Sequence, residues 1–230
     1  MLEALRAEVY EANLELVRRG LVLYTFGNAS GISREQKLVV IKPSGVPYDK
    51  MSPADMVITD LEGRVVEGNL RPSSDLDTHV ALYRAFPSIG GIAHTHSRHA
   101  TAWAQACREI PCFGTTHADY FHGPVPVTAP LTDDEIESNY EANTGIAILR
   151  LMEGRDPLSC PAVLVAGHAP FCWGKSVTDA AHNAVIVEEL AAMAWQTLTI
   201  NPSAKSIAET LRDKHHFRKH GPNATYGQKH

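Results

Sequence analysis

The sequence has few cysteines and no long hydrophobic run, and each scarcity excludes a class of protein. Only four cysteines occur among 230 residues, and none forms a Cys-x-x-Cys pair, so reduced thiols are expected rather than a disulfide framework. No apolar run is long enough to span a bilayer. Basic residues are outnumbered, 21 against 26 acidic ones, for a net charge of -5. We therefore expect neither a nucleic-acid nor a membrane partner.

The N-terminus also lacks the features of an export signal, because it carries acidic residues early and has no continuous apolar stretch. Together with the unpaired cysteines, this predicts a cytoplasmic protein in which any metal is held by histidine and carboxylate. With 44% hydrophobic residues the chain can bury a substantial core, and its length favours one domain over residues 1–230.

Hydrophobic periodicity predicts short strands mixed with helices, which is typical of one α/β domain with a mixed or largely antiparallel sheet. Helices are expected over about 2–20, 74–86, 97–107, 132–150 and 178–198, with a last one beyond 203, and strands over 37–42, 56–60, 63–67, 90–96 and 161–168. The expected N-caps are Ser73 or Ser74, Thr132 and Thr178.

The segment 90–97, Gly-Gly-Ile-Ala-His-Thr-His-Ser, carries the strongest chemical pattern. Side chains alternate along a strand, so His94 and His96 are expected on one face, where two imidazoles can bind one metal ion. The alternative is that they are two ordinary histidines at a strand end. His168, at the end of the strand predicted at 161–168, is a third candidate ligand, and His99 and His117 are its rivals.

A second group of residues is suited to binding phosphate. Lys42 ends a strand before Ser44 and Gly45, and glycine permits close approach of the backbone. Ser73 and Ser74 precede a helix, whose first N–H groups favour an anion, and Asn28 offers an amide. Taken singly, each is equally explained as a cap or a solvated side chain.

A third group offers acids and bases. Asp119 lies in a loop among threonines and a histidine, where a carboxylate can carry protons, and Asp75 follows the serine pair. The end of the chain, about 202–230, is basic and contains Tyr226. Such an end is commonly a solvated tail, and the alternative is that it covers an anionic pocket.

These motifs, in this order, resemble the L-ribulose-5-phosphate 4-epimerases of the class II aldolase/adducin superfamily. The resemblance covers the whole chain and includes a Ser-Ser-Asp at 73–75, where the sugar-phosphate aldolases of the superfamily have Ser-Ser-Glu. It implies a single three-layer α/β/α domain with a central, largely antiparallel sheet, and a cyclic homotetramer whose active sites are shared between neighbouring subunits. Two departures from the pattern are local, Pro222 and the ending Lys229–His230.

The resemblance also implies the site. It places Zn²⁺, one per subunit with Mn²⁺ or Co²⁺ as substitutes, on three histidines with a carboxylate close by, and a sugar phosphate on the second group. The metal set is then His94, His96 and His168 with Asp75; the phosphate set is Asn28, Lys42, Ser44, Gly45, Ser73 and Ser74. Asp119 and the neighbouring subunit's Tyr226 become the proton carriers, supported by His215 and Arg218, and the tail at about 202–230 completes the neighbour's site.

The expected reaction is epimerisation at C4 of L-ribulose 5-phosphate to D-xylulose 5-phosphate, because retro-aldol cleavage of C3–C4 avoids deprotonating a carbon that is not acidic. The alternatives are a class II sugar-phosphate aldolase, like L-fuculose-phosphate aldolase, which releases its fragments, and a non-catalytic module like the adducin head. A zinc hydrolase is disfavoured because the sequence has no His-Glu-x-x-His motif.

Overall fold

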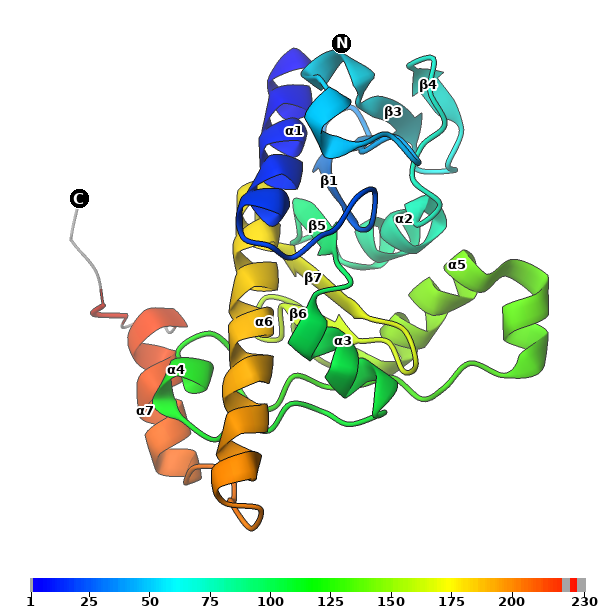
Figure 1. Cartoon of the computed structure of the whole chain (residues 1–230). Helices are drawn as coiled ribbons and strands as arrows, with labels where there is room; N and C mark the ends of the chain where they lie inside the picture. The colour runs from blue at the N-terminus through cyan, green and yellow to red at the C-terminus, as the bar shows by residue number, and fades with distance from the viewer. Residues whose placement is uncertain (1, 221–223, 227–230) are drawn as a thin grey trace.

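The centre of the molecule is a seven-stranded antiparallel sheet, seen in a computed structural model that describes residues 2–220 and 224–226 (Figure 1). The strands run in the order β4-β3-β2-β1-β5-β7-β6, and every neighbouring pair is antiparallel. Their bounds are β1 Asn28–Ser33, β2 Leu38–Ile41, β3 Val57–Asp60, β4 Val65–Glu67, β5 Gly91–His94, β6 Ala162–Leu164 and β7 Pro170–Gly174. In the central pair, β1 and β5, Asn28 lies directly opposite His94.

Helices cover both faces of this sheet, which confirms the predicted three-layer fold (Figure 1). One face packs against α1 (Glu3–Arg18), α3 (Arg98–Gln105) and α6 (Val177–Ile200), and the other against α2 (Leu76–Ala85) and α5 (Asp133–Leu151). The remaining elements are η1 Tyr48–Lys50, η2 Pro53–Asp55, α4 Thr115–Ala118 and α7 Glu209–His220. Strand residues divide between the layers as alternation requires: Ile92 packs with α2 and α5, and Ala93 with α1 and α6.

Gly91 allows α6 to begin directly against β5. A Cβ at Gly91 would overlap the backbone of Ser176 and Val177, the N-cap and the first residue of that helix. Ser176 caps α6 by accepting a hydrogen bond from the Asp179 N–H, while Asp179 accepts one from the Ser176 N–H. The cap predicted at Thr178 is therefore wrong, and the capping box lies two residues earlier.

Other expectations are corrected in detail. Asp75, not Ser73 or Ser74, occupies the N-cap position of α2, and its side chain makes no capping hydrogen bond. The strand predicted over 161–168 ends at Leu164, because the chain turns at Gly167, which has a φ of 70°, and returns as β7. The capping box of Thr132 and Glu135 at the start of α5 is confirmed.

Two strands were not predicted, β1 and β7.

Within the described residues all four cysteines are free, in accordance with the expected reduced thiols. None of the helices in that part of the chain is both long and apolar enough to cross a membrane. Of the C-terminal features singled out from the sequence, Pro222 and Lys229–His230 lie outside the described residues.

Candidate active site

A cavity of about 400 Å³ lies at the end of β5 and brings the first two predicted groups together. The strand ends of β1 and β2, the segment before α2, the β6–β7 turn and one turn of α5 form its wall. Every predicted metal and phosphate residue lines it, namely Asn28, Lys42, Ser44, Gly45, Ser73, Ser74, Asp75, His94, His96 and His168. Residues spread over the sequence from 28 to 168 thus share one wall.

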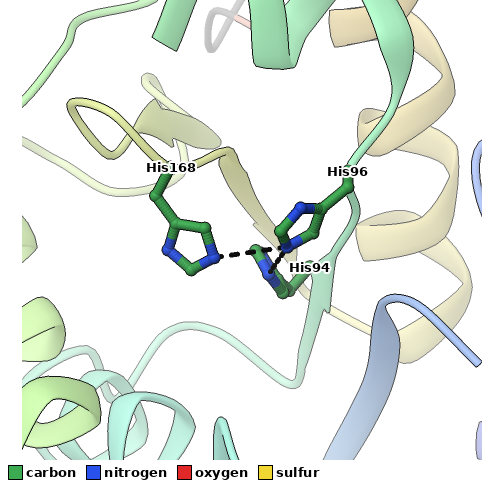
Figure 2. Close-up of side chains that lie close together, drawn as sticks. All are labelled: His94, His96 and His168. Carbon is green, nitrogen blue, oxygen red and sulfur yellow. Dashed lines mark hydrogen bonds between the residues drawn. The ribbon is translucent and has the colours of Figure 1, made fainter. Parts of the chain in front are cut away.

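Three histidines converge in this cavity (Figure 2). The His96 Nε2 lies 3.1 Å from the His94 Nε2 and 3.2 Å from the His168 Nε2, and the three candidate ligand atoms all lie within 4.8 Å of one another. The shared face of His94 and His96 is therefore confirmed. Nitrogens this close must share a proton, repel one another or bind a common cation, and a divalent ion resolves the conflict for all three.

The protonation states of the histidines also fit the binding of a metal ion. Burial and the nearby His94 and His96 lower the pKa of His168 to about 4, and burial with His94 also lowers the pKa of His96. Both rings are therefore neutral at pH 7, as metal ligands must be. The His94 Nδ1 lies 3.0 Å from the Pro170 carbonyl oxygen, so an Nδ1–H donates there and leaves Nε2 free for a metal. These residues fit a divalent cation such as Zn²⁺.

The geometry excludes both rivals for the third ligand. The His99 Nδ1 lies 2.8 Å from an oxygen of Glu188, and this carboxylate also accepts hydrogen bonds from the N–H groups of His99 and Ala100. Glu188 thereby caps α3, the helix that follows His96. His117 belongs to α4, and its Nε2 lies 2.8 Å from the carbonyl oxygen of Gly123, which follows that helix. Of the three candidates, only His168 faces His94 and His96, from a turn rather than from a strand end.

Buried His117 is expected to make the metal-free protein acid-labile. Burial lowers its pKa to about 4, whereas the unfolded chain takes up this proton near pH 6.5. Between these values the unfolded state binds more protons, so the free energy of unfolding falls as the pH falls, by about 3 kcal/mol from this residue. Urea unfolding at about pH 7 and about pH 4.5 measures the loss. His117→Gln, which keeps an N–H for Gly123, should make the profile less steep, while His168 and the other buried histidines still contribute to it. An equally steep profile in this variant would contradict the assignment.

Asp75 stands beside the metal set and is held by an amide. Its Oδ2 accepts a hydrogen bond of 2.6 Å from Asn28 Nδ2, which also donates to the Ser73 hydroxyl at 3.0 Å. Burial raises the pKa of Asp75, but His94, His79 and the Asn28 hydrogen bond outweigh it and hold the pKa below its usual value. Asn28 therefore links the metal and phosphate sets, and both of its amide protons are engaged within them.

The phosphate set contains a buried cation without a carboxylate partner among the described residues. Lys42 is 2% exposed, and its Nζ lies 4.7 Å from the centre of the Tyr48 ring and 3.3 Å from the Pro43 carbonyl oxygen. Burial lowers its pKa to about 8. Among the described residues, the N–H groups of Gly45 and Ser74 also have no hydrogen-bond acceptor. A buried amine and free N–H groups around one cavity favour an anionic group.

The predicted acid and base residues gather elsewhere, around α4 and α7. Asp119 accepts hydrogen bonds from Arg218 at 2.9 and 3.0 Å and lies 3.0 Å from the His215 Nδ1, and the Tyr226 ring packs over Arg218. Burial raises the pKa of Asp119, but Arg218, His215 and Lys219 together hold it below its usual value, so the group is ionised. Asp119 follows the short helix α4 instead of lying in a loop.

This acid and base group does not line the cavity of the same chain. Figure 1 shows α4 and α7 on one side of α6 and the turn between β6 and β7 on the other. Asp119 and Tyr226 therefore lie together, apart from the three histidines.

Sequence reasoning missed two cavity residues of α5, Tyr140 and Glu141. The helix is interrupted at Asn139, whose φ of -147° and ψ of 88° are not helical. The interruption lets the following turn face the cavity. The helical periodicity of 132–150 carried no signal for it, because the exposed polar side chains before and after Asn139 fit one continuous helix.

Comparison with known proteins agrees with this architecture. Residues 7–195 match the family described as Class II Aldolase and Adducin N-terminal domain. Among solved structures, an L-fuculose 1-phosphate aldolase is 26% identical with a TM-score of 0.78, covering 92% of this chain and 94% of that chain. YgbL from Klebsiella pneumoniae, described as a putative aldolase/epimerase/decarboxylase, is 24% identical with a TM-score of 0.72, covering 93% and 99%. A sugar-phosphate aldolase from Thermotoga maritima is 18% identical with a TM-score of 0.66, covering 86% and 96%.

The family match spans most of the chain and includes β1 to β7, all three histidines and the phosphate set. The histidine geometry is suited to a divalent metal, and the buried Lys42 lines the same cavity. The protein therefore belongs to the class II aldolase and adducin family.

Proposed function

We propose that the protein is a zinc-dependent epimerase that converts L-ribulose 5-phosphate to D-xylulose 5-phosphate. The observation that carries the proposal is the Ser73-Ser74-Asp75 wall of the cavity, which joins the phosphate set to the histidines through Asn28. The resemblance assigns an aspartate at this position to the epimerases and a glutamate to the aldolases. The shorter carboxylate is bound by the Asn28 amide, which suits an electrostatic role beside the metal better than that of a proton carrier.

The chain's own residues would act as follows. His94, His96 and His168 would hold the cation, which when bound supplies electrostatic stabilisation of negative charge on the ketone end of the substrate. A base removes the proton of the C4 hydroxyl, the C3–C4 bond breaks, and its electron pair moves into the ketone end. The aldehyde fragment rotates and re-forms the bond through its other face, and an acid returns the proton to the C4 oxygen.

Two proton carriers on opposite faces of the aldehyde are required, and Asp119 and Tyr226 fill these roles in our proposal. The resemblance places only Tyr226 on the neighbouring subunit, but Asp119 lies with Tyr226 beyond α6 and does not line the cavity of its own chain. We therefore change that expectation, and in our proposal a neighbouring subunit supplies both. This agrees with the cyclic homotetramer that the resemblance implies, in which each interface is heterologous. His215 and Arg218, which contact Asp119, would keep its carboxylate ionised and oriented.

Lys42→Gln is expected to raise KM for the sugar phosphate about tenfold to a hundredfold, with a smaller effect on kcat, because it removes the buried cation that offsets the phosphate charge. Steady-state kinetics measure both constants. Lys37→Gln, on the turn before β2, is a matched control that should leave them unchanged. A fall in kcat alone would place Lys42 in the chemistry and not in phosphate binding.

A class II sugar-phosphate aldolase is the second candidate, favoured by the likeness to an L-fuculose 1-phosphate aldolase. One experiment separates the two. The protein is incubated with L-ribulose 5-phosphate and the products are followed by ¹³C NMR. D-xylulose 5-phosphate supports the epimerase, whereas accumulating glycolaldehyde phosphate supports a lyase. L-fuculose 1-phosphate is tested in a parallel incubation. If neither substrate reacts, the proposal fails, and the result favours a non-catalytic role like that of the adducin head.

A further inference from the structure

His168 differs from the other two histidines in how it is held. His94 is the last residue of β5 and its Nδ1 lies 3.0 Å from the Pro170 carbonyl oxygen, so strand pairing and a backbone group fix its ring. His168 lies in the turn between β6 and β7, next to Gly167 with its φ of 70°. A turn constrains a side chain less than a paired strand does. Another contact is needed to hold this ring toward the metal.

The Tyr140 hydroxyl provides that contact. Its oxygen lies 3.1 Å from the His168 Nδ1, on the opposite side of the imidazole from the Nε2 that faces His96. A ligating Nε2 must carry no proton, so the single proton of neutral His168 must reside on Nδ1 and be donated to the Tyr140 oxygen.

The position of Tyr140 is itself fixed by the interruption of α5. The Asn139 side chain accepts a hydrogen bond of 3.2 Å from the Ala142 N–H, so it caps the helical segment that Tyr140 opens. Thr78 of α2 donates to the Glu141 carbonyl oxygen at 2.6 Å, and Gly145 leaves no room for a Cβ beside Ala81 of the same helix. The segment is therefore docked on α2, the helix that begins at the Ser73-Ser74-Asp75 wall.

We propose that Tyr140 is a positioning residue of the metal centre, which selects the tautomer and orientation of His168 through its hydroxyl. The inference rests on the metal site of the proposed function and is independent of the identity of the substrate. It makes the kinked helix α5 part of the support of the site, although this helix contributes no metal ligand.

The test measures metal affinity directly. The full chain is freed of metal, and Zn²⁺ is titrated in competition with a chromophoric chelator for wild type, Tyr140→Phe and the control Tyr10→Phe on α1. Loss of a hydrogen-bond partner of a ligating histidine is expected to weaken Zn²⁺ binding about 10-fold to 100-fold in Tyr140→Phe. Tyr10→Phe should bind as wild type does. Thr78→Val removes the hydrogen bond that docks α5 on α2 but keeps the Tyr140 hydroxyl. This variant should give an intermediate loss of Zn²⁺ affinity.

A second readout examines the tautomer itself. In ¹⁵N NMR spectra of the zinc-loaded wild type, the His168 Nδ1 should carry a proton protected from exchange, and Tyr140→Phe should lose that protection while its metal-free form melts as wild type does. Equal zinc affinity in Tyr140→Phe and wild type would overturn the inference and leave the metal site intact. A wild type that takes up no Zn²⁺ would overturn both.

Discussion

His96→Asn is expected to lose its metal and at least about a thousandfold in turnover together, because electrostatic stabilisation of the developing charge is the largest catalytic contribution in such a site. His96 is the central member of the set, since its Nε2 lies within 3.2 Å of both other Nε2 atoms. Metal content by mass spectrometry and epimerase turnover are measured on the same preparation. Added Zn²⁺ or Mn²⁺ should restore chelator-treated wild type but not the variant.

His99→Asn is the matched control. It also removes an imidazole three to five residues from the ligand pair, but that imidazole contacts Glu188 and does not line the cavity. The variant should retain its metal, because the backbone N–H groups of residues 99 and 100 still bind Glu188. Full activity in a demonstrably metal-free sample, or equal metal loss in the two variants, would refute the assigned site.

Asp119→Asn is expected to slow turnover by about two to four orders of magnitude while the metal stays bound, and subunit mixing should restore part of the lost activity. His96→Asn and Asp119→Asn are unfolded and refolded together in equal amounts. In a cyclic ring with shared sites, one chain supplies the histidines and its neighbour supplies Asp119. Random mixing then makes about a quarter of the sites complete, and activity should return to about that fraction.

A second mixture controls for simple recovery on refolding. His94→Asn mixed with His96→Asn cannot produce a complete site, because both changes lie in the same histidine set, and it should stay inactive. Native mass spectrometry verifies that the chains have mixed. If mixed assemblies of His96→Asn and Asp119→Asn recover no activity, Asp119 acts within its own chain or has no catalytic role.

The metal pair could be predicted from the sequence because strand alternation is a local property. The spacing of His94 and His96 fixes their common face whatever the rest of the chain does. His168 is different, since a turn at Gly167, and not a strand end, brings it to the site. Its inclusion depended on the resemblance to a family, and the rivals His99 and His117 could be excluded only after their partners were known.

The strand β1 was missed for a physical reason. Asn-Ala-Ser-Gly-Ile-Ser contains one β-branched apolar residue, so its composition indicates a turn. It is extended because β2 and β5 pair with it on both sides and helices bury it, which are long-range effects. The contact between Tyr140 and His168 was equally hidden, because it depends on the interruption at Asn139 and on the docking of α5 against α2.

The pairing of Asn28 with His94 also bears on how the protein folds. β2 to β4 can form with β1 as a local meander, and β6 and β7 as a local hairpin, but the ladder between β1 and β5 must close a long stretch of chain. Loop-closure entropy makes such pairing slow. Asn28 and His94 become neighbours only in that step, so the phosphate set and the three histidines line one cavity only in a chain whose two halves have joined. A ligand that contacts both groups thus favours the joined state by mass action, and the rate at which binding of such a ligand develops during refolding reports on closure of this central seam.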